Sequence, residues 1–124
     1  MKLCKRLALI VLTINFIFSD VISEESALNI AENFFYSKND SRLSSFNYDS
    51  IELMSFRNEN VFHLLKLSPQ GFILISADDH MMPILGYSFE NNFDPTNIPV
   101  NIENLFNTYH QELQELKNEN RFNE

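Results

Sequence analysis

The sequence predicts a single α+β domain, in which an antiparallel sheet of about four strands has an N-terminal and a C-terminal helix packed on it, both on one face. Three observations predict this architecture. Apolar residues recur at helical spacing after residue 23, four short runs between 51 and 88 are rich in strand-forming residues, and helical spacing returns after residue 101. At 124 residues the chain is too short for two independent hydrophobic cores.

The first 23 residues form a segment of different character, typical of a secretory signal peptide. A basic start at residues 2–6 precedes an apolar run at 7–18. A membrane-spanning helix needs about 20 apolar residues, so we expect this run to be cleaved and not embedded. Cleavage after Ser23 or after Ser19 would give a mature protein that begins at Glu24 or Asp20. We assign the signal to residues 1–23 and the domain to residues 24–124, and we expect it to be secreted or periplasmic and without a membrane anchor.

Cysteine content and charge exclude several function classes. Cys4 is the only cysteine, and its place in the predicted signal leaves the domain without a disulfide or a cysteine nucleophile. A net charge of −8 makes nucleic acid a poor partner. His63, His80 and His110 have no metal-site spacing, and two glycines allow no phosphate loop or serine elbow. We therefore predict a protein that is not an enzyme and holds no cofactor or metal.

The first helix has a recognisable start and end. Ser23 is the expected N-cap, and Glu24 and Glu25 follow in the first turn, where the helix dipole favours negative charge. We expect the helix to fade between residues 37 and 40 and a polar loop to continue to residue 49. The apolar positions with helical spacing are Ala27, Ile30, Ala31, Phe34 and Phe35.

Four strands are expected at 51–56, 61–67, 72–77 and 84–88. Between the second and third lies Ser68-Pro69-Gln70-Gly71, whose residue order favours a type I turn and predicts a hairpin. The third run is apolar on both faces of a pleated strand and should therefore be central in the sheet.

Two groups of side chains have both a functional and a structural interpretation. Asp78-Asp79-His80 could suggest metal ligands or an acid-base pair, but adjacent side chains on an extended chain point in opposite directions, so we interpret it as a polar turn. The aromatic residues could line a ligand pocket, but their spacing favours core packing. They are Phe34, Phe35, Phe72, Tyr87, Phe93, Phe106 and Tyr109.

Residues 91–100 should form an irregular loop, since Pro95 and Pro99 permit no sheet ladder. Asn101 is the expected N-cap of a last helix, and the polar tail 118–124 is expected to fray. The apolar positions with helical spacing are Leu105, Phe106, Tyr109, Leu113 and Leu116.

The strings GFILISADD at 71–79 and PILGYS at 83–88, followed by Phe93-Asp94, resemble the prosegment of streptopain-type cysteine peptidases and the stand-alone Spi protease inhibitors. The similarity continues through 101–105 and Tyr109 and extends over nearly the whole mature chain. Taken together, the order, spacing and residue types of these strings are specific. The motif residues that we expect to be structural are Gly71, Phe72, Ser76, Asp78, Pro83, Ile84, Leu85, Gly86 and Tyr87.

The resemblance implies a secreted, non-covalent inhibitor of a streptopain-like cysteine peptidase. We expect it to be a monomer when unbound. The chain resembles only the prosegment, the inhibitor half of such a peptidase. In that family, a loop before the last helix blocks the active-site cleft and disturbs the catalytic histidine. Matched by motif, this loop is 94–101 and includes Asp94 and Ile98. Asn101 best matches the blocking asparagine, and Asn97 is the alternative. Asn101 could also cap the helix, and the two roles are compatible.

Two other functions fit the same resemblance. The chain could be a separately encoded prosegment that assists the folding of a peptidase. It could also be the remnant of a truncated peptidase gene.

Overall fold

The computed structural model describes residues 21–40 and 42–122. The predicted signal segment, with Cys4, lies outside the described residues except for its last three positions. Within the described part of the chain, no helix has both the length and the apolar character that crossing a membrane requires.

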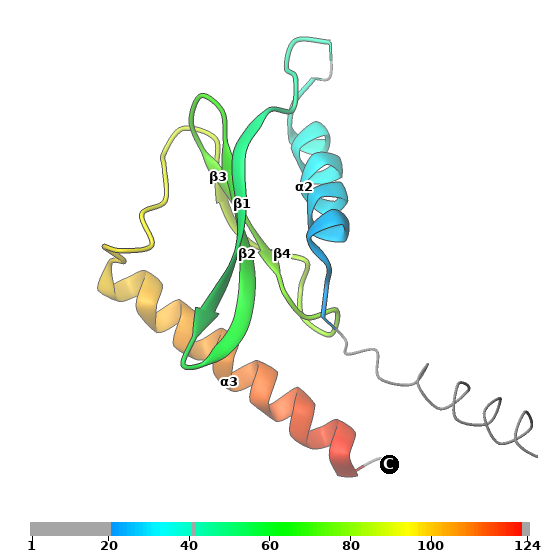
Figure 1. Cartoon of the computed structure of the whole chain (residues 1–124), viewed down its shortest axis with the longest axis vertical. Coiled ribbons are helices and arrows are strands. Elements are labelled where there is room, and N and C mark those ends of the chain that lie inside the picture. The colour runs from blue at the N-terminus through cyan, green and yellow to red at the C-terminus, as the bar shows by residue number, and fades with distance from the viewer. Residues whose placement is uncertain (1–20, 41, 123–124) are drawn as a thin grey trace, which may run out of the picture.

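Two helices and one four-stranded antiparallel sheet form the domain, so the predicted α+β class is confirmed (Figure 1). The strands lie in sequence order, and β2 and β3 are therefore the central pair, as the apolar character of the third run predicts. In order, the elements are α2 (Glu24–Lys38), β1 (Tyr48–Phe56), β2 (Glu59–Leu67), β3 (Phe72–Ser76), β4 (Ile84–Ser88) and α3 (Val100–Phe122).

The two helices cover opposite faces of the sheet, so the prediction that both lie on one face is wrong (Figure 1). Successive strand side chains point to opposite faces, and β2 and β3 are apolar on both. Helices on one face of the sheet could not bury the apolar side chains of both faces. The α2-face cluster consists of Ala27, Ala31, Leu65, Leu67, Ile73 and Ile75. The α3-face cluster consists of Val61, Phe62, Leu64, Leu74, Leu85 and Phe106.

Helix α2 begins as the sequence predicts. Ser23 is the N-cap, and its hydroxyl accepts a hydrogen bond from the Ser26 N–H at 3.2 Å. Ala27 and Ala31 are fully buried one turn apart, because their small side chains allow the helix to lie close to the sheet. At the other end, the Asn39 side chain donates to the Phe35 carbonyl at 2.9 Å.

The first two hairpins of the sheet differ in part from what the sequence predicts. A two-residue turn with positive φ at Arg57 (51°) and Asn58 (64°) joins β1 and β2. β1 ends at Phe56 as expected, whereas β2 begins at Glu59, two residues before its expected start. The β2–β3 hairpin is present, but it is not a type I turn. The Gly71 N–H donates to Asn92 Oδ1 at 3.0 Å and not back to Ser68, and the Ser68–Pro69 bond is cis.

Helix α3 begins two residues earlier than predicted, and its packed face keeps Phe106, Tyr109 and Leu113 of the predicted apolar positions. The Pro99 carbonyl accepts the N–H groups of Ile102 (3.0 Å) and Glu103 (2.9 Å), so Pro99 is the N-cap and the prediction for Asn101 is wrong. This start places Ile102 against the α3-face cluster, whereas Leu105 is 41% exposed. The backbone stays helical to Phe122 and does not fray from residue 118.

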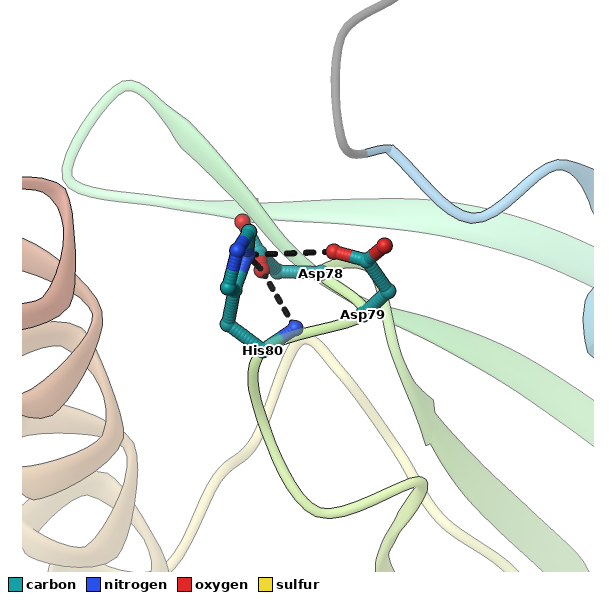
Figure 2. A group of neighbouring side chains, drawn as sticks. All are labelled: Asp78, Asp79 and His80. Atoms are coloured by element: carbon teal, nitrogen blue, oxygen red, sulfur yellow. Dashed lines mark hydrogen bonds and ion pairs between the residues drawn. The ribbon is translucent and has the colours of Figure 1, made fainter. Parts of the chain in front are cut away.

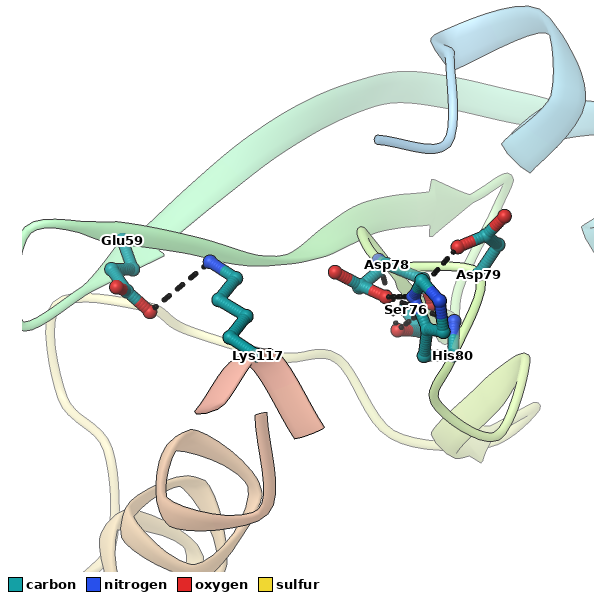
Figure 3. A network of polar contacts seen from close by, with 6 residues as sticks. All are labelled: Glu59, Ser76, Asp78, Asp79, His80 and Lys117. Atoms are coloured by element: carbon teal, nitrogen blue, oxygen red, sulfur yellow. Dashed lines mark hydrogen bonds and ion pairs between the residues drawn. The ribbon is translucent and has the colours of Figure 1, made fainter. Parts of the chain in front are cut away.

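Contacts with the β1–β2 hairpin hold the second half of α3. Glu59 Oε2 accepts a hydrogen bond from Gln114 Nε2 and lies 3.7 Å from Lys117 Nζ. His110 Nε2 is also 3.7 Å from the same oxygen. Figure 3 shows the Glu59–Lys117 pair between the hairpin and the helix. These polar contacts extend the attachment of α3 beyond the buried Leu113.

Candidate functional site

The segment between β4 and α3 passes from one face of the sheet to the other. Phe89 packs against the α2-face cluster, whereas Phe93 packs against the α3-face cluster. In Figure 1 this segment runs in yellow along the side of the molecule away from α2. It contains residues 94–99 of the predicted inhibitory stretch 94–101, whose last two residues begin α3, and its path is fixed by contacts at both ends.

The loop base consists of Asn92, Phe93 and Ile98. The side-chain oxygen of Asn92 accepts the Gly71 N–H at 3.0 Å, which ties the loop to the β2–β3 hairpin. The Phe93 ring lies 5.3 Å from that of Phe72 and 6.2 Å from that of Phe106. Ile98 packs against the same α3-face cluster. These contacts hold the loop on both sides of residues 94–97.

The loop tip, Asp94 to Asn97, is a compact polar turn. Asp94 Oδ1 accepts hydrogen bonds from the Thr96 hydroxyl at 2.6 Å and the Thr96 N–H at 2.9 Å, and the Asn97 N–H approaches the Asp94 carbonyl at 3.3 Å. The hydroxyl bond lowers the pKa of Asp94, and the backbone bond and the nearby charge of Lys66 lower it further. The tip is thus ordered by its own side chains.

The four residues predicted to bind a peptidase lie at different depths. Asp94, Asn97 and Asn101 are exposed, whereas Ile98 is half-buried and belongs to the loop base. Asn97 ends the tip, and Asn101 is the second residue of α3. The structure therefore brings two exposed asparagines to the junction between the loop and the helix. Sequence reasoning missed Asn92 and Thr96. An Asp two residues before Thr96 signals such a turn, but nothing local links Asn92 to Gly71.

The family-motif residues of β3 and its ends form the frame behind the loop. Gly71 has φ of 103°, and a Cβ there would lie 2.6 Å from the Ser88 carbonyl oxygen. Phe72 and Ser76 begin and end β3, and the buried Ser76 hydroxyl donates to the Asp78 carbonyl at 2.9 Å. The Ser76 N–H donates to the Pro83 carbonyl at 2.9 Å, which connects the ends of β3 and β4.

Residues 84–88 of the PILGYS string form β4, which contacts both helices. The Tyr109 hydroxyl of α3 donates to the Leu85 carbonyl at 3.0 Å, and burial raises the pKa of Tyr109 above its usual value. Ile84 packs against the α2-face cluster, and Leu85 belongs to the α3-face cluster. Gly86 lies opposite Leu74 in β3. Tyr87 is 46% exposed, and its ring meets that of Phe34 edge-on at 4.8 Å.

Asp78, Asp79 and His80 gather at the end of β3 (Figure 2). His80 Nδ1 lies 2.8 Å from Asp78 Oδ1 and 3.0 Å from Asp79 Oδ1, and the His80 N–H also donates to Asp78 at 2.8 Å. The expectation that these side chains point apart is wrong, because the chain turns here. Their polar atoms bond to one another and, as Figure 3 shows, to Ser76, which fits the predicted polar turn. Asp79 and His80 are exposed, and the side-chain ligand atoms of the three residues lie within 4.8 Å of one another.

Comparison with known proteins gives a match to the Spi protease inhibitor family over residues 19–113. The chain belongs to the Spi protease inhibitor family. It is also 26% identical over 111 residues to the thiol protease/hemagglutinin PrtT of Porphyromonas gingivalis. That alignment covers 86% of this chain and 13% of the relative, so the chain spans only a small part of that protein. No solved structure matches the chain. The family resemblance predicted from residues 71–105 is therefore confirmed.

Proposed function

We propose that this Spi-family protein is an exported inhibitor, without enzymatic activity, of a streptopain-like cysteine peptidase. In this proposal the loop tip and the start of α3 enter the active-site cleft of the peptidase and block substrate without covalent chemistry. The observation that carries the proposal is an exposed polar tip whose two ends are both anchored, in a chain of a protease inhibitor family.

The anchoring matters because binding is weakened by the entropy lost when a mobile loop is ordered. Here Phe93 and Ile98 pack against the α3-face cluster on either side of the tip. Asp94 and Thr96 order the tip itself through two hydrogen bonds. A peptidase would therefore meet a loop already close to one conformation, which favours slow dissociation.

Asn97 and Asn101 supply the polar groups for such an interface. An asparagine amide both donates and accepts hydrogen bonds, so it can bond an imidazole and a backbone group at the same time. Both residues are exposed, and Asn101 lies in the first turn of α3, where N–H groups have no intrahelical acceptor. Such an arrangement suits contact with a catalytic histidine and its neighbouring backbone.

Titration of a purified streptopain-like peptidase with the exported form of this protein tests the proposal. We expect residual activity to fall to near zero at stoichiometric or moderately higher ratios and to recover on dilution. Papain, titrated in parallel, should retain its activity. If several streptopain-like peptidases keep full activity at a large excess of this protein, the inhibitor assignment is refuted.

A second function, assistance in peptidase folding, is favoured by the similarity to a stretch of a thiol protease. A prosegment-like partner supplied in trans would raise the yield of active peptidase when its catalytic domain is co-expressed without a prosegment. A higher yield together with weak inhibition of the mature enzyme would favour this function. Strong inhibition with no gain in yield would leave the inhibitor alone.

A further inference from the structure

The three residues before α2 are built into the fold. Val21 forms an antiparallel bridge with Asp78, beyond the end of β3. The Ile22 N–H donates to the Ala77 carbonyl at 2.9 Å, and the Ile22 side chain packs against the α2-face cluster. The chain entering α2 therefore adds a short pairing to the sheet.

The same segment also contacts a buried side chain, that of His63. Its side chain is on β2, only 4% of the residue is exposed, and Nε2 lies 2.8 Å from the Ile22 carbonyl oxygen. A carbonyl oxygen only accepts hydrogen bonds, so Nε2 carries the proton and donates. Without Ile22, this buried N–H would lose its partner.

Cleavage after Ser23, one of the two positions that the sequence allows, would remove all of these contacts. It would also remove the Ser23 hydroxyl that caps α2 and replace it with a positively charged amino group on Glu24. A positive charge at a helix N-terminus opposes the helix dipole. The structure thus disfavours a mature protein that begins at Glu24.

We propose that signal peptidase cleaves between Ser19 and Asp20, so that residues 20–23 stay in the mature protein. This inference rests on the proposal that the chain is exported. Ser19 is a small residue directly after the apolar run, and the family match also begins at residue 19. In the reaction, water adds across the Ser19–Asp20 peptide bond, which leaves a carboxylate on Ser19 and an amine on Asp20.

The test is expression of the whole precursor in a secreting bacterial host, followed by intact mass measurement and N-terminal sequencing of the exported protein. We expect Asp20 as the first residue. A first residue of Glu24 would overturn the assigned site and leave export intact. A full-length chain retained in the cells would overturn export as well, so the two failures are distinguishable.

Two matched variants sharpen this result. Ser23→Asp keeps an N-cap side chain but places a charged residue before the rival bond, and we expect the same Asp20 start and the same yield. Ser19→Leu places a bulky residue before the proposed bond and should abolish the product that begins at Asp20. Loss of processing in Ser23→Asp, with normal processing in Ser19→Leu, would assign the cut to Ser23 and refute the proposal.

A stability measurement gives a readout that does not depend on export. Protein beginning at Asp20 should melt on the order of 10 °C above protein beginning at Glu24, because the shorter form lacks the cap of α2 and the acceptor for His63. Equal melting temperatures would remove the structural reason for the assignment.

Discussion

The base and the tip of the β4–α3 loop are stabilised in opposite ways. The base is held by contacts distant in sequence, through Phe93 and Ile98 on the α3-face cluster and Asn92 on Gly71. The tip is held by contacts between neighbours, through Asp94 and its bonds to Thr96. We therefore expect the base to determine the stability of the loop and the tip to determine binding to a peptidase. Changes at the base should unfold or displace the loop, whereas changes at the tip should alter binding with little effect on folding.

The largest loss of stability is expected when the cluster under the base is opened. Phe106 is 1% exposed, and its ring stacks on that of Phe62 at 4.8 Å. Phe106→Ala should lower the free energy of unfolding by about 3–5 kcal/mol, measured by urea denaturation. Leu105→Ala, at the exposed neighbour, is the control and should change it by less than about 0.5 kcal/mol. Equal effects would contradict the assigned core.

A smaller loss is expected from a change beneath the loop anchor. Gly71→Ala forces a side chain into a conformation with φ of 103° and within 2.6 Å of the Ser88 carbonyl. The free energy of unfolding should fall by about 1–3 kcal/mol, measured by denaturation. In the matched control Gly86→Ala, the new Cβ would meet Leu74 Cδ1 at 3.7 Å, an ordinary contact. A loss in Gly71→Ala no larger than that in the control would contradict the claim that the backbone at Gly71 is constrained.

Loss of the hydrogen bond between Asn92 and Gly71 should lower the free energy of unfolding by less than the two changes above. Asn92→Ala removes the acceptor for the Gly71 N–H and should lower the free energy of unfolding by about 1 kcal/mol. It should also weaken inhibition, because the base would no longer fix the loop. Asn91→Ala, at the exposed neighbouring residue, is the control for both measurements. Unchanged inhibition by Asn92→Ala would show that the anchor does not position the tip.

The smallest effect is expected from the titration of Asp94. Its pKa is lowered in the folded protein by Thr96, so its contribution to stability is present above the unfolded pKa, about 4, and is lost as the pH falls through the folded pKa. In an NMR titration, the Thr96 amide should shift with a midpoint below that of an ordinary aspartate. Asp94→Asn, which keeps an acceptor and does not ionise, should abolish the shift. A midpoint at or above the ordinary value would contradict the turn.

The sequence predicts local structure well and pairing across the fold less well. The cap at Ser23, the β4 strand and the central place of β3 follow from patterns within a few residues. The placement of the helices on opposite faces depends on which face of the sheet the apolar side of each helix contacts. The apolar residues on both faces of β3 nevertheless indicate that each face must be covered by another element. Pro99, and not Asn101, is the N-cap of α3, because the helix begins earlier and Ile102 packs on the sheet from within its first turn.

For the candidate site, the family strings locate the loop, but they do not reveal how it is held. The bond between Asn92 and Gly71 joins residues 21 positions apart, and no local pattern encodes it. The pattern of alternating strand side chains also does not reveal that Asp78, Asp79 and His80 gather, because the chain turns at these residues and is no longer extended.

The most direct test of the central claim compares Asn97→Ala, Asn101→Ala and the double variant with the unaltered protein as inhibitors of one streptopain-like peptidase. All four should unfold at nearly the same urea concentration, because both side chains are exposed. We predict that the double variant raises the inhibition constant by on the order of tenfold or more, and the single variants would show which asparagine is responsible. Equal inhibition by all four proteins would contradict the claim that this loop blocks the peptidase.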